Sequence, residues 1–208
     1  PIISGNVSFY NESKQGNAVV PSPVICAVGK IDDIAMAKTS QLFKDTLTLV
    51  KIGKRYEEFA QTQLEPYLSE YSSVAPQVRF DQEKKQNELV LDLYKHNLVE
   101  SCHDISMGGV WVSVIEMVLG ERGKPFVGLE LDLSTSKQIL ADLFSENGGY
   151  VIATHNIDAV KQRCEQQQID IDVIGNTISN KQLRLKTASE TIQWNLDDMS
   201  QQWNQFNP

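Results

Sequence analysis

HDISMGG, residues 103–109, is the stretch of the sequence that indicates most about the fold. It follows Leu98–Cys102, a short segment that predicts a strand, and it precedes Val110–Leu119, whose apolar residues predict a helix. Two glycines at a helix start let a ligand approach the backbone closely, and the free amides there favour an anion. A plain turn with a helix cap is the alternative, and both hypotheses stay open from these residues alone.

Two polar side chains begin this stretch. Asp104 has the chemistry to orient a metal ion or to cap the following helix. A lone histidine beside a turn, such as His103, is more often a structural residue than a ligand. Both residues are therefore candidate site residues with a structural alternative.

Predicted helices and strands alternate on both sides of this stretch. Helices are predicted at 56–71, 81–97, 110–119, 136–144 and 158–167, and strands at 47–52, 98–102, 127–133, 149–154, 170–174 and 182–186. Hairpin-like and crossover connections are mixed. This pattern predicts an α+β fold with α/β-like layers.

Three details of these elements are specific enough to test. Pro66 predicts a kink or an early end in the helix at 56–71. In the helix at 81–97, the predicted apolar face consists of Val90, Leu91, Tyr94 and Leu98. The tail, with Trp194 and Trp203, is expected to pack back as a final helix or turn.

The first 46 residues predict a separate organisation. Residues 1–31 are predicted as β structure, because Val7–Phe9 alternates and Pro23–Val28 is a short apolar run. Residues 32–46 are polar and aperiodic, which is typical of a linker. The remaining residues, 47–208, then form the main predicted unit.

Composition limits the classes of function. The 208 residues carry a net charge of −8, so no broad nucleic-acid or anionic-membrane surface is expected. No apolar run is long enough to span a membrane, and there is no signal-like leader. The three cysteines, Cys26, Cys102 and Cys164, form no CxxC pair, which argues against structural zinc and favours reduced thiols in the cytoplasm.

A second candidate site lies in SGNVSFYNES, residues 4–13. Gly5 would permit close approach of a ligand to the backbone. Asn6 offers a carbonyl oxygen suited to magnesium, and Ser8 lies on the same face of a strand. Spacing alone still favours a plain strand end here.

A resemblance to a known protein family favours a ligand site over a plain strand end. PIISGNVSFYNES followed by PSPVICAVGKIDD resembles the GNVSxYNE and PTPVIGxVG pair of phosphoribosylformylglycinamidine synthase. SCHDISMGGVWVSVIEM resembles the HDxSxGGLAxAxAEM segment of the same family, and LFSEN at 143–147 resembles its LFSE segment. Four motifs occur in the family's order across essentially the whole chain. On them the sequence is identified as a member of this family.

The resemblance implies a ligase of purine biosynthesis. The family converts formylglycinamide ribonucleotide to its amidine with ATP, Mg²⁺ and ammonia from a glutaminase, and its chain is an internal duplication. This sequence is similar to the end of the second N-terminal subdomain, 1–31, and, after the linker at 32–46, to the second C-terminal subdomain, 47–208. That subdomain belongs to the aminoimidazole-ribonucleotide-synthase-like ATP-binding superfamily. The family's catalytic histidine lies in the first half.

The resemblance also implies roles for residues and partners. Gly5 is implied to touch ATP, Asn6 to bind Mg²⁺ and Ser8 to contact the ribonucleotide, with no catalytic residue in this chain. We expect a piece of a longer cytoplasmic synthase, inactive alone. It would need the N-terminal half of the synthase, a glutaminase subunit and, as a further candidate partner, a small accessory subunit.

Departures from the family leave other roles open. Gly53–Tyr56 lacks the Gly-Gly-Ser of the family, Met107 stands where relatives carry a second acid, and only Ser145 and Glu146 match the family's SETQ or SESQ. His103, Asp104 and Glu146 therefore remain candidates for ligand contact, with a structural role as the alternative. A non-catalytic structural half, a docking scaffold or an inactive remnant is the alternative function. Another superfamily member is disfavoured by GNVSFYNES.

Overall fold

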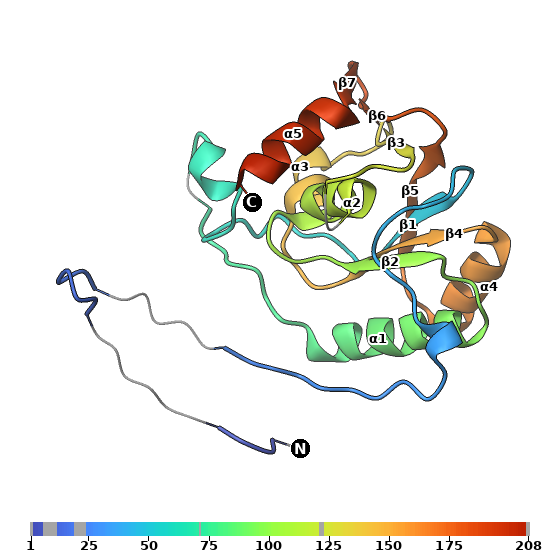
Figure 1. Cartoon of the computed structure of the whole chain (residues 1–208), viewed down its shortest axis with the longest axis horizontal. Helices are drawn as coiled ribbons and strands as arrows, with labels where there is room; N and C mark the ends of the chain where they lie inside the picture. Colours follow the sequence, from blue (N-terminus) through green and yellow to red (C-terminus); the bar gives the residue numbers. More distant parts are fainter. Residues whose placement is uncertain (1, 6–11, 19–23, 71, 121–122, 207–208) are drawn as a thin grey trace. The chain divides into compact units, whose positions relative to one another are not determined.

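A seven-stranded sheet forms the centre of the larger of two units into which the chain divides, Pro1–Asp32 and Asp33–Pro208 (Figure 1). The computed structural model describes residues 2–5, 12–18, 24–70, 72–120 and 123–206. In chain order the strands are β1 Thr48–Ile52, β2 Ser101–Asp104, β3 Gly128–Asp132, β4 Tyr150–Thr154, β5 Ile171–Ile178, β6 Gln182–Lys186 and β7 Thr191–Asn195. Their order in the sheet is β2-β4-β1-β5-β3-β6-β7. Neighbouring strands are antiparallel except β3 and β6, which are parallel.

Helices cover both faces of this sheet. They are α1 Phe80–Lys95, α2 Gly109–Leu119, α3 Ile139–Phe144, α4 Ile157–Gln167 and α5 Leu196–Phe206, with short 3-10 helices η1 Ile34–Met36 and η2 Glu65–Tyr67. One core cluster joins α2, α3 and α5 to one face, and a second joins α1 and α4 to the other. Strand β1 serves both clusters, because Leu49 points into the first and Val50 into the second. The mixed sheet between helices confirms the predicted α+β class.

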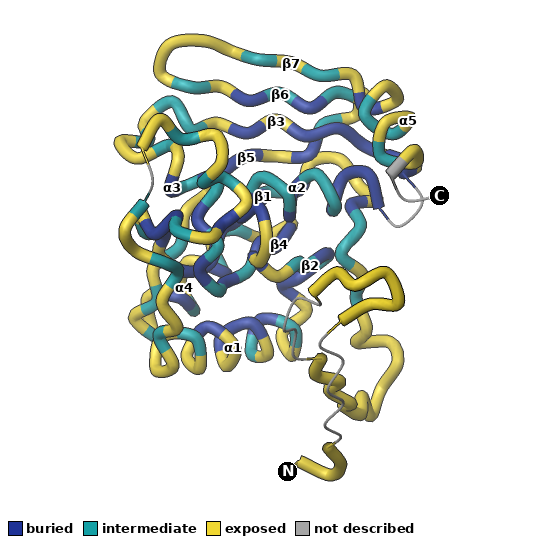
Figure 2. Tube along the Cα trace, turned by 90° about the vertical axis from the view of Figure 1, so that its left-hand side faces the viewer, coloured by how far each residue is buried: buried dark blue, intermediate teal, exposed yellow. Residues whose placement is uncertain are grey.

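The two core clusters do not extend over the whole sheet. Leu129 on β3 and Leu183 on β6 are fully buried under the first set of helices, and Figure 2 shows that buried residues along these strands alternate with exposed or partly exposed ones. The residues that alternate with these leucines along β3 and β6 point to the opposite face of the sheet, which is in contact with solvent. Glu130 pairs there with Arg184 at 3.2 Å. A strand with one buried face and one wet face produces the alternation seen in the sequence.

The helix predicted at 56–71 is wrong. Over the described residues of that range the chain is irregular apart from the 3-10 helix η2, whose second residue is Pro66. Gln61 has φ +63°, which an α-helix does not allow. Side chains of this segment bond to distant backbone and side-chain groups instead, as described below.

The other helices are confirmed within a few residues, and one residue of the apolar face predicted at 81–97 is wrong. Val90 and Leu98 are buried as predicted and Tyr94 packs against the same core, whereas Leu91 is 61% exposed. Leu89 and Leu93 are fully buried in its place. The buried face of α1 therefore lies at helical spacing around Leu89, Val90 and Leu93.

Three further predictions need correction. Residues 24–28 form no strand, and Val24 and Val28 are 94% and 89% exposed. Leu42, in the predicted linker, is fully buried, and its amide donates to the carbonyl of Met117 at 2.8 Å. Trp194 lies on β7, a strand that was not predicted, and only the following α5 matches the expected final helix. The predicted alternation at Val7–Phe9 lies outside the described residues.

Candidate functional site

The N-terminal candidates are the least described part of the chain. Gly5 is exposed, and among the described residues no atom lies within 4 Å of where a Cβ would be. Asn6 and Ser8 lie outside the described residues. Their roles in binding Mg²⁺ and the ribonucleotide, and that of Gly5 in binding ATP, stay predictions.

The histidine of the HDISMGG stretch is held by protein groups. His103 and Asp104 are the last two residues of β2 and not part of a loop. The imidazole of His103 is 16% exposed, and its Nε2 lies 3.1 Å from a carboxylate oxygen of Glu116 on α2. Its Nδ1 lies 2.7 Å from the backbone carbonyl of Asp104. These contacts give the imidazole a structural role.

The side chain of Asp104 points toward solvent, with 66% of it exposed. Its backbone carbonyl accepts a hydrogen bond from the hydroxyl of Ser113 on α2 at 2.8 Å. Across the described ranges, no group of three or more His, Cys, Asp or Glu side chains is arranged to hold a metal ion.

The two glycines of the stretch are required by the backbone. Gly108 has φ +77° and Gly109 has φ +67°, a region that favours glycine. A Cβ on Gly109 would lie 2.6 Å from the carbonyl oxygen of Leu143, which belongs to α3. Close packing of α2 on the end of α3 therefore explains Gly109 without any ligand.

The anion expected at the glycine loop is supplied by the protein itself. One carboxylate oxygen of Glu146 accepts a hydrogen bond from the amide of Gly108 at 2.9 Å. The same oxygen accepts from the amide of Gln63 at 2.8 Å. Glu146 thus joins the turn before α2 to the irregular segment at 56–68, and it satisfies an amide that the sequence left open for a ligand.

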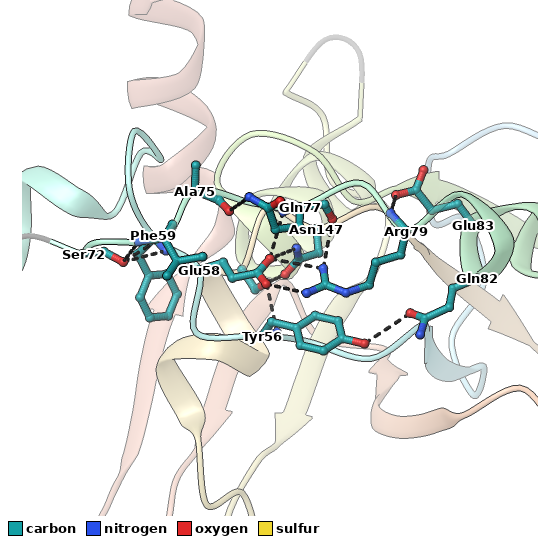
Figure 3. A network of polar contacts seen from close by, with 12 residues as sticks. Tyr56, Glu58, Phe59, Ser72, Ala75, Gln77, Arg79, Gln82, Glu83 and Asn147 are labelled. Carbon is teal, nitrogen blue, oxygen red and sulfur yellow. Dashed lines mark hydrogen bonds and ion pairs between the residues drawn. The ribbon is translucent and has the colours of Figure 1, made fainter.

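A polar network that the sequence did not reveal lies beside this contact (Figure 3). The carboxylate of Glu58 forms an ion pair with Arg79 and accepts from the side-chain amide of Asn147 at 2.7 Å. It also accepts from the backbone amide of Gln77 at 2.9 Å. Arg79 in turn lies over the ring of Tyr56, 3.6 Å from its centroid. The bonds from Arg79, Gln77 and Asn147 hold the pKa of Glu58 at about 2.

A buried arginine, Arg55, connects the end of β1 to the loop that contains Asn147. Arg55 is 2% exposed, and its guanidinium donates to the backbone carbonyls of Asn147 and Gly148. Burial lowers the pKa of Arg55 to about 10, so the guanidinium remains charged at neutral pH. The available signal in the sequence was that Gly53–Tyr56, which contains Lys54 and Arg55, lacks the Gly-Gly-Ser of the family. The role of Arg55 could not be predicted from that signal, because it depends on the loop at 145–149 lying beside Arg55 in the fold.

Comparison with known proteins shows which family has this architecture. A family model described as "AIR synthase related protein, C-terminal domain" matches residues 52–187, which is more than half of the chain. The chain belongs to this family. The matched residues begin in β1 and extend past β6, so they include Glu58, Arg79 and Glu146.

Three relatives of this chain carry the same name. It is 31% identical to the Pyrococcus horikoshii protein over 208 residues, covering 97% of this chain and 27% of the relative. It is 36% identical to the Methanothrix thermoacetophila protein over 156 residues (73% and 20%) and 28% identical to the Bartonella quintana protein over 212 residues (100% and 28%). Each is named phosphoribosylformylglycinamidine synthase subunit PurL, which confirms the resemblance. The chain spans about a quarter of the length of these curated relatives.

Solved structures agree on the fold. Thermotoga maritima PurL complexed with FGAR superposes with a TM-score of 0.65 at 16% identity, covering 80% of this chain and 30% of that one. The structure titled PurLQS from the same organism gives 0.61 at 18% identity, covering 80% and 28%. At such low identity the likeness establishes the fold alone. Among the described residues no helix is both long and apolar enough to cross a membrane.

Proposed function

We propose that the chain acts as the C-terminal part of a phosphoribosylformylglycinamidine synthase. That ligase converts formylglycinamide ribonucleotide, ATP and ammonia to the amidine, ADP and phosphate. The observation that carries the proposal is the alignment of 97% of this chain with a PurL protein, in which four family motifs keep their order. Thermotoga maritima PurL, which has the same fold, is complexed with FGAR in one structure and with ATP in another, which supports the same ligand classes here.

In this proposal the N-terminal motif forms one wall of a composite site. Gly5 would lie against ATP, Asn6 would offer its carbonyl oxygen to Mg²⁺, and Ser8 would contact the ribonucleotide. Bound Mg²⁺ would neutralise phosphate charge, and such chemistry depends mostly on positioning and charge stabilisation. No residue of this chain serves as nucleophile or base. The rest of the synthase, in the same or a separate chain, a glutaminase and an accessory subunit would complete a cytoplasmic enzyme.

A segment exchange tests the proposal. The segment of Bartonella quintana PurL that aligns with this chain, 28% of that protein, is replaced by residues 1–208. The chimera is then expressed in a bacterium that lacks its own synthase. Growth without added purine is expected. A chimera that is expressed and folded but supports no growth would contradict the proposal.

One observation favours a second candidate, a non-catalytic structural half. Glu146 already occupies the Gly108 amide, and Arg55 occupies the carbonyls of Asn147 and Gly148. Loops satisfied by their own side chains have little left to offer a ligand. Growth of the chimera that is unaffected by Asn6→Ala and by Ser8→Ala would favour this structural role.

A further inference from the structure

The two edges of the sheet differ in what covers them. Strand β2 forms one edge, and the chain before β1 lies along it. The amide of Cys102 donates to the carbonyl of Thr39 at 3.3 Å, and the hydroxyl of Ser101 donates to the carbonyl of Gln41 at 2.8 Å. Strand β7 forms the other edge, beside β6 (Figure 2). In the described part of the chain, no segment pairs with the outer side of β7, so this edge is open.

Hydrogen bonds at the two ends of the β6–β7 ladder show which residues of β7 bond to β6. At one end the amide of Leu196 donates to the carbonyl of Lys181 at 3.2 Å. At the other end the amide of Thr187 donates to the carbonyl of Glu190 at 2.8 Å. Along an antiparallel pair, residue pairs that exchange hydrogen bonds alternate with pairs that do not. Both bonds indicate the same alternation, in which the even-numbered residues of β7 bond to β6.

The odd-numbered residues of β7 therefore face the open edge. The backbone N–H and C=O groups of Thr191, Gln193 and Asn195 point away from β6, and all three residues are exposed. Ile192 and Trp194 bond to β6, and their side chains lie on the face that carries the first core cluster. A row of backbone donors and acceptors is thus left without a partner among the described groups.

Strand β7 lacks the features that usually prevent a sheet edge from pairing. Natural edge strands carry charged residues, proline or bulges that block the approach of another strand. The five residues of β7, TIQWN, include no charge and no proline, and their register with β6 is continuous. Isoleucine, threonine and tryptophan are residues that favour strands. The edge is therefore suited to the addition of another strand.

We propose that β7 pairs with β7 of a second copy of this chain, antiparallel about a two-fold axis at Gln193. In this register Gln193 lies opposite Gln193 of the second copy, and Thr191 lies opposite Asn195. Each of these pairs exchanges both N–H···O=C bonds, because these are the residues that face outward. The two seven-stranded sheets then form one continuous sheet. This interface goes beyond the proposed function and does not depend on it.

The side chains of β7 are complementary to those of a second β7. Ile192 of each copy lies opposite Trp194 of the other in a non-hydrogen-bonded pair, where side chains approach most closely. A β-branched residue opposite an aromatic one is a favourable cross-strand pair. On the other face the amides of the two Gln193 side chains can donate to and accept from each other. Because β7 is uncharged, the pairing brings no like charges of the two strands together.

Sedimentation of the 208-residue chain tests the proposal. We expect a dimer with a Kd of roughly 10 to 100 µM, because an edge contact of this length is smaller than a standard interface. Hydrogen exchange at low and high protein concentration then locates the contact. Exchange should slow in the dimer at the amides of Thr191, Gln193 and Asn195, and should stay the same at Ile192 and Trp194, which already bond to β6.

Two results would overturn the proposal. One is a chain that stays monomeric up to about 1 mM. The other is a dimer in which the amides of Thr191, Gln193 and Asn195 exchange as fast as in the monomer, since the copies would then meet through another surface.

Variants separate edge pairing from folding. Gln193→Pro removes an outward N–H and no bond to β6, so the chain should fold while its dimerisation weakens roughly tenfold or more. Gln193→Lys places two ammonium groups opposite each other and should weaken dimerisation roughly tenfold at low salt and less at high salt.

The matched control is Gln166→Lys, which adds the same charge at an exposed position of α4, a helix that packs on the second core cluster. It should dimerise as the unchanged chain does. Unchanged dimerisation in Gln193→Pro, or equal weakening by Gln166→Lys and Gln193→Lys, would contradict the pairing.

Discussion

Glu146 and Gly108 are joined by a hydrogen bond of 2.9 Å between a carboxylate oxygen and a backbone amide. The bond places a negative charge at the start of α2, where helix amides and the helix dipole favour an anion. Because the same oxygen also accepts from Gln63, the carboxylate holds the irregular segment at 56–68 against the turn before α2. Glu146, which the family motif suggested as a candidate ligand contact, thus stabilises the fold here by joining two segments of the chain.

Glu146→Ala is expected to lower the free energy of unfolding by roughly 1 to 2 kcal/mol, because two amides lose a charged acceptor. Glu146→Gln keeps an acceptor oxygen and should cost about half as much. Chemical denaturation measures both. Hydrogen exchange should quicken at Gly108 and Gln63 in the alanine variant. Glu88→Ala, with 61% of its side chain exposed, is the control that should change neither quantity. Unaltered exchange at both amides would contradict the assigned role.

Glu58 makes stability depend on pH. Arg79 lowers the pKa of Glu58 from 4.5 to about 2 in the folded chain. A depressed folded pKa stabilises the fold above the unfolded pKa, and this stabilisation is lost as pH falls from about 4.5 to about 2.

Glu58→Gln should therefore cost on the order of 2 kcal/mol at neutral pH, and the difference from the unchanged chain should shrink toward pH 2. Urea denaturation across this range measures it. The control is Glu88→Gln, which removes an exposed pair with Lys84 and should have little effect on stability at any pH in this range. A cost that stays constant with pH would count against the Arg79 pairing.

Lys51 is a buried charge between two carboxylates. Its ammonium lies 2.7 Å from Asp142 and 3.0 Å from Asp172, and its side chain is 3% exposed. Lys51→Met should lower the free energy of unfolding by about 3 kcal/mol, because Asp142 then loses its partner in a poorly solvated position. Adding Asp142→Asn should recover part of that loss. Denaturant titration of both single variants and the double variant gives the coupling energy, and strictly additive effects would refute the pairing.

Asn6 carries the proposed metal contact. In the PurL chimera, Asn6→Ala should weaken Mg²⁺-dependent ATP binding roughly tenfold, as is common when a group that orients a metal is lost. Asn17→Ala, in the exposed turn that follows, is the matched control and should bind as before. Calorimetry with and without Mg²⁺ measures both. Equal affinity in the Asn6 variant would exclude the metal contact.

The sequence predicted those elements whose own periodicity determines them. α2 and β3 have continuous or alternating apolar patterns that require no knowledge of distant residues, and both were located within two residues. The face of α1 was harder to predict, because Leu91 is as apolar as Leu89 and only packing against the sheet and α4 decides which of the two is buried.

The segment at 56–71 could not be predicted locally. Its conformation depends on Glu58 contacting Arg79 and Asn147, and on Gln63 contacting Glu146, which lie far away in the sequence. The helical pattern there was therefore overridden by tertiary contacts. The contacts of Glu146 could not be predicted locally either. The sequence motif matched Glu146 to a family position but did not reveal that its carboxylate accepts a hydrogen bond from the Gly108 amide.

The most direct test of the account is product formation by the purified chimera of Bartonella quintana PurL with this chain. Formylglycinamide ribonucleotide, ATP, Mg²⁺ and ammonium are supplied, and the amidine is detected by mass spectrometry. The account predicts ATP-dependent amidine and equimolar phosphate, reduced by Asn6→Ala and retained in Asn17→Ala. A folded chimera that hydrolyses no ATP and forms no amidine, beside an active unaltered PurL, would contradict the claim that this chain forms part of a synthase site.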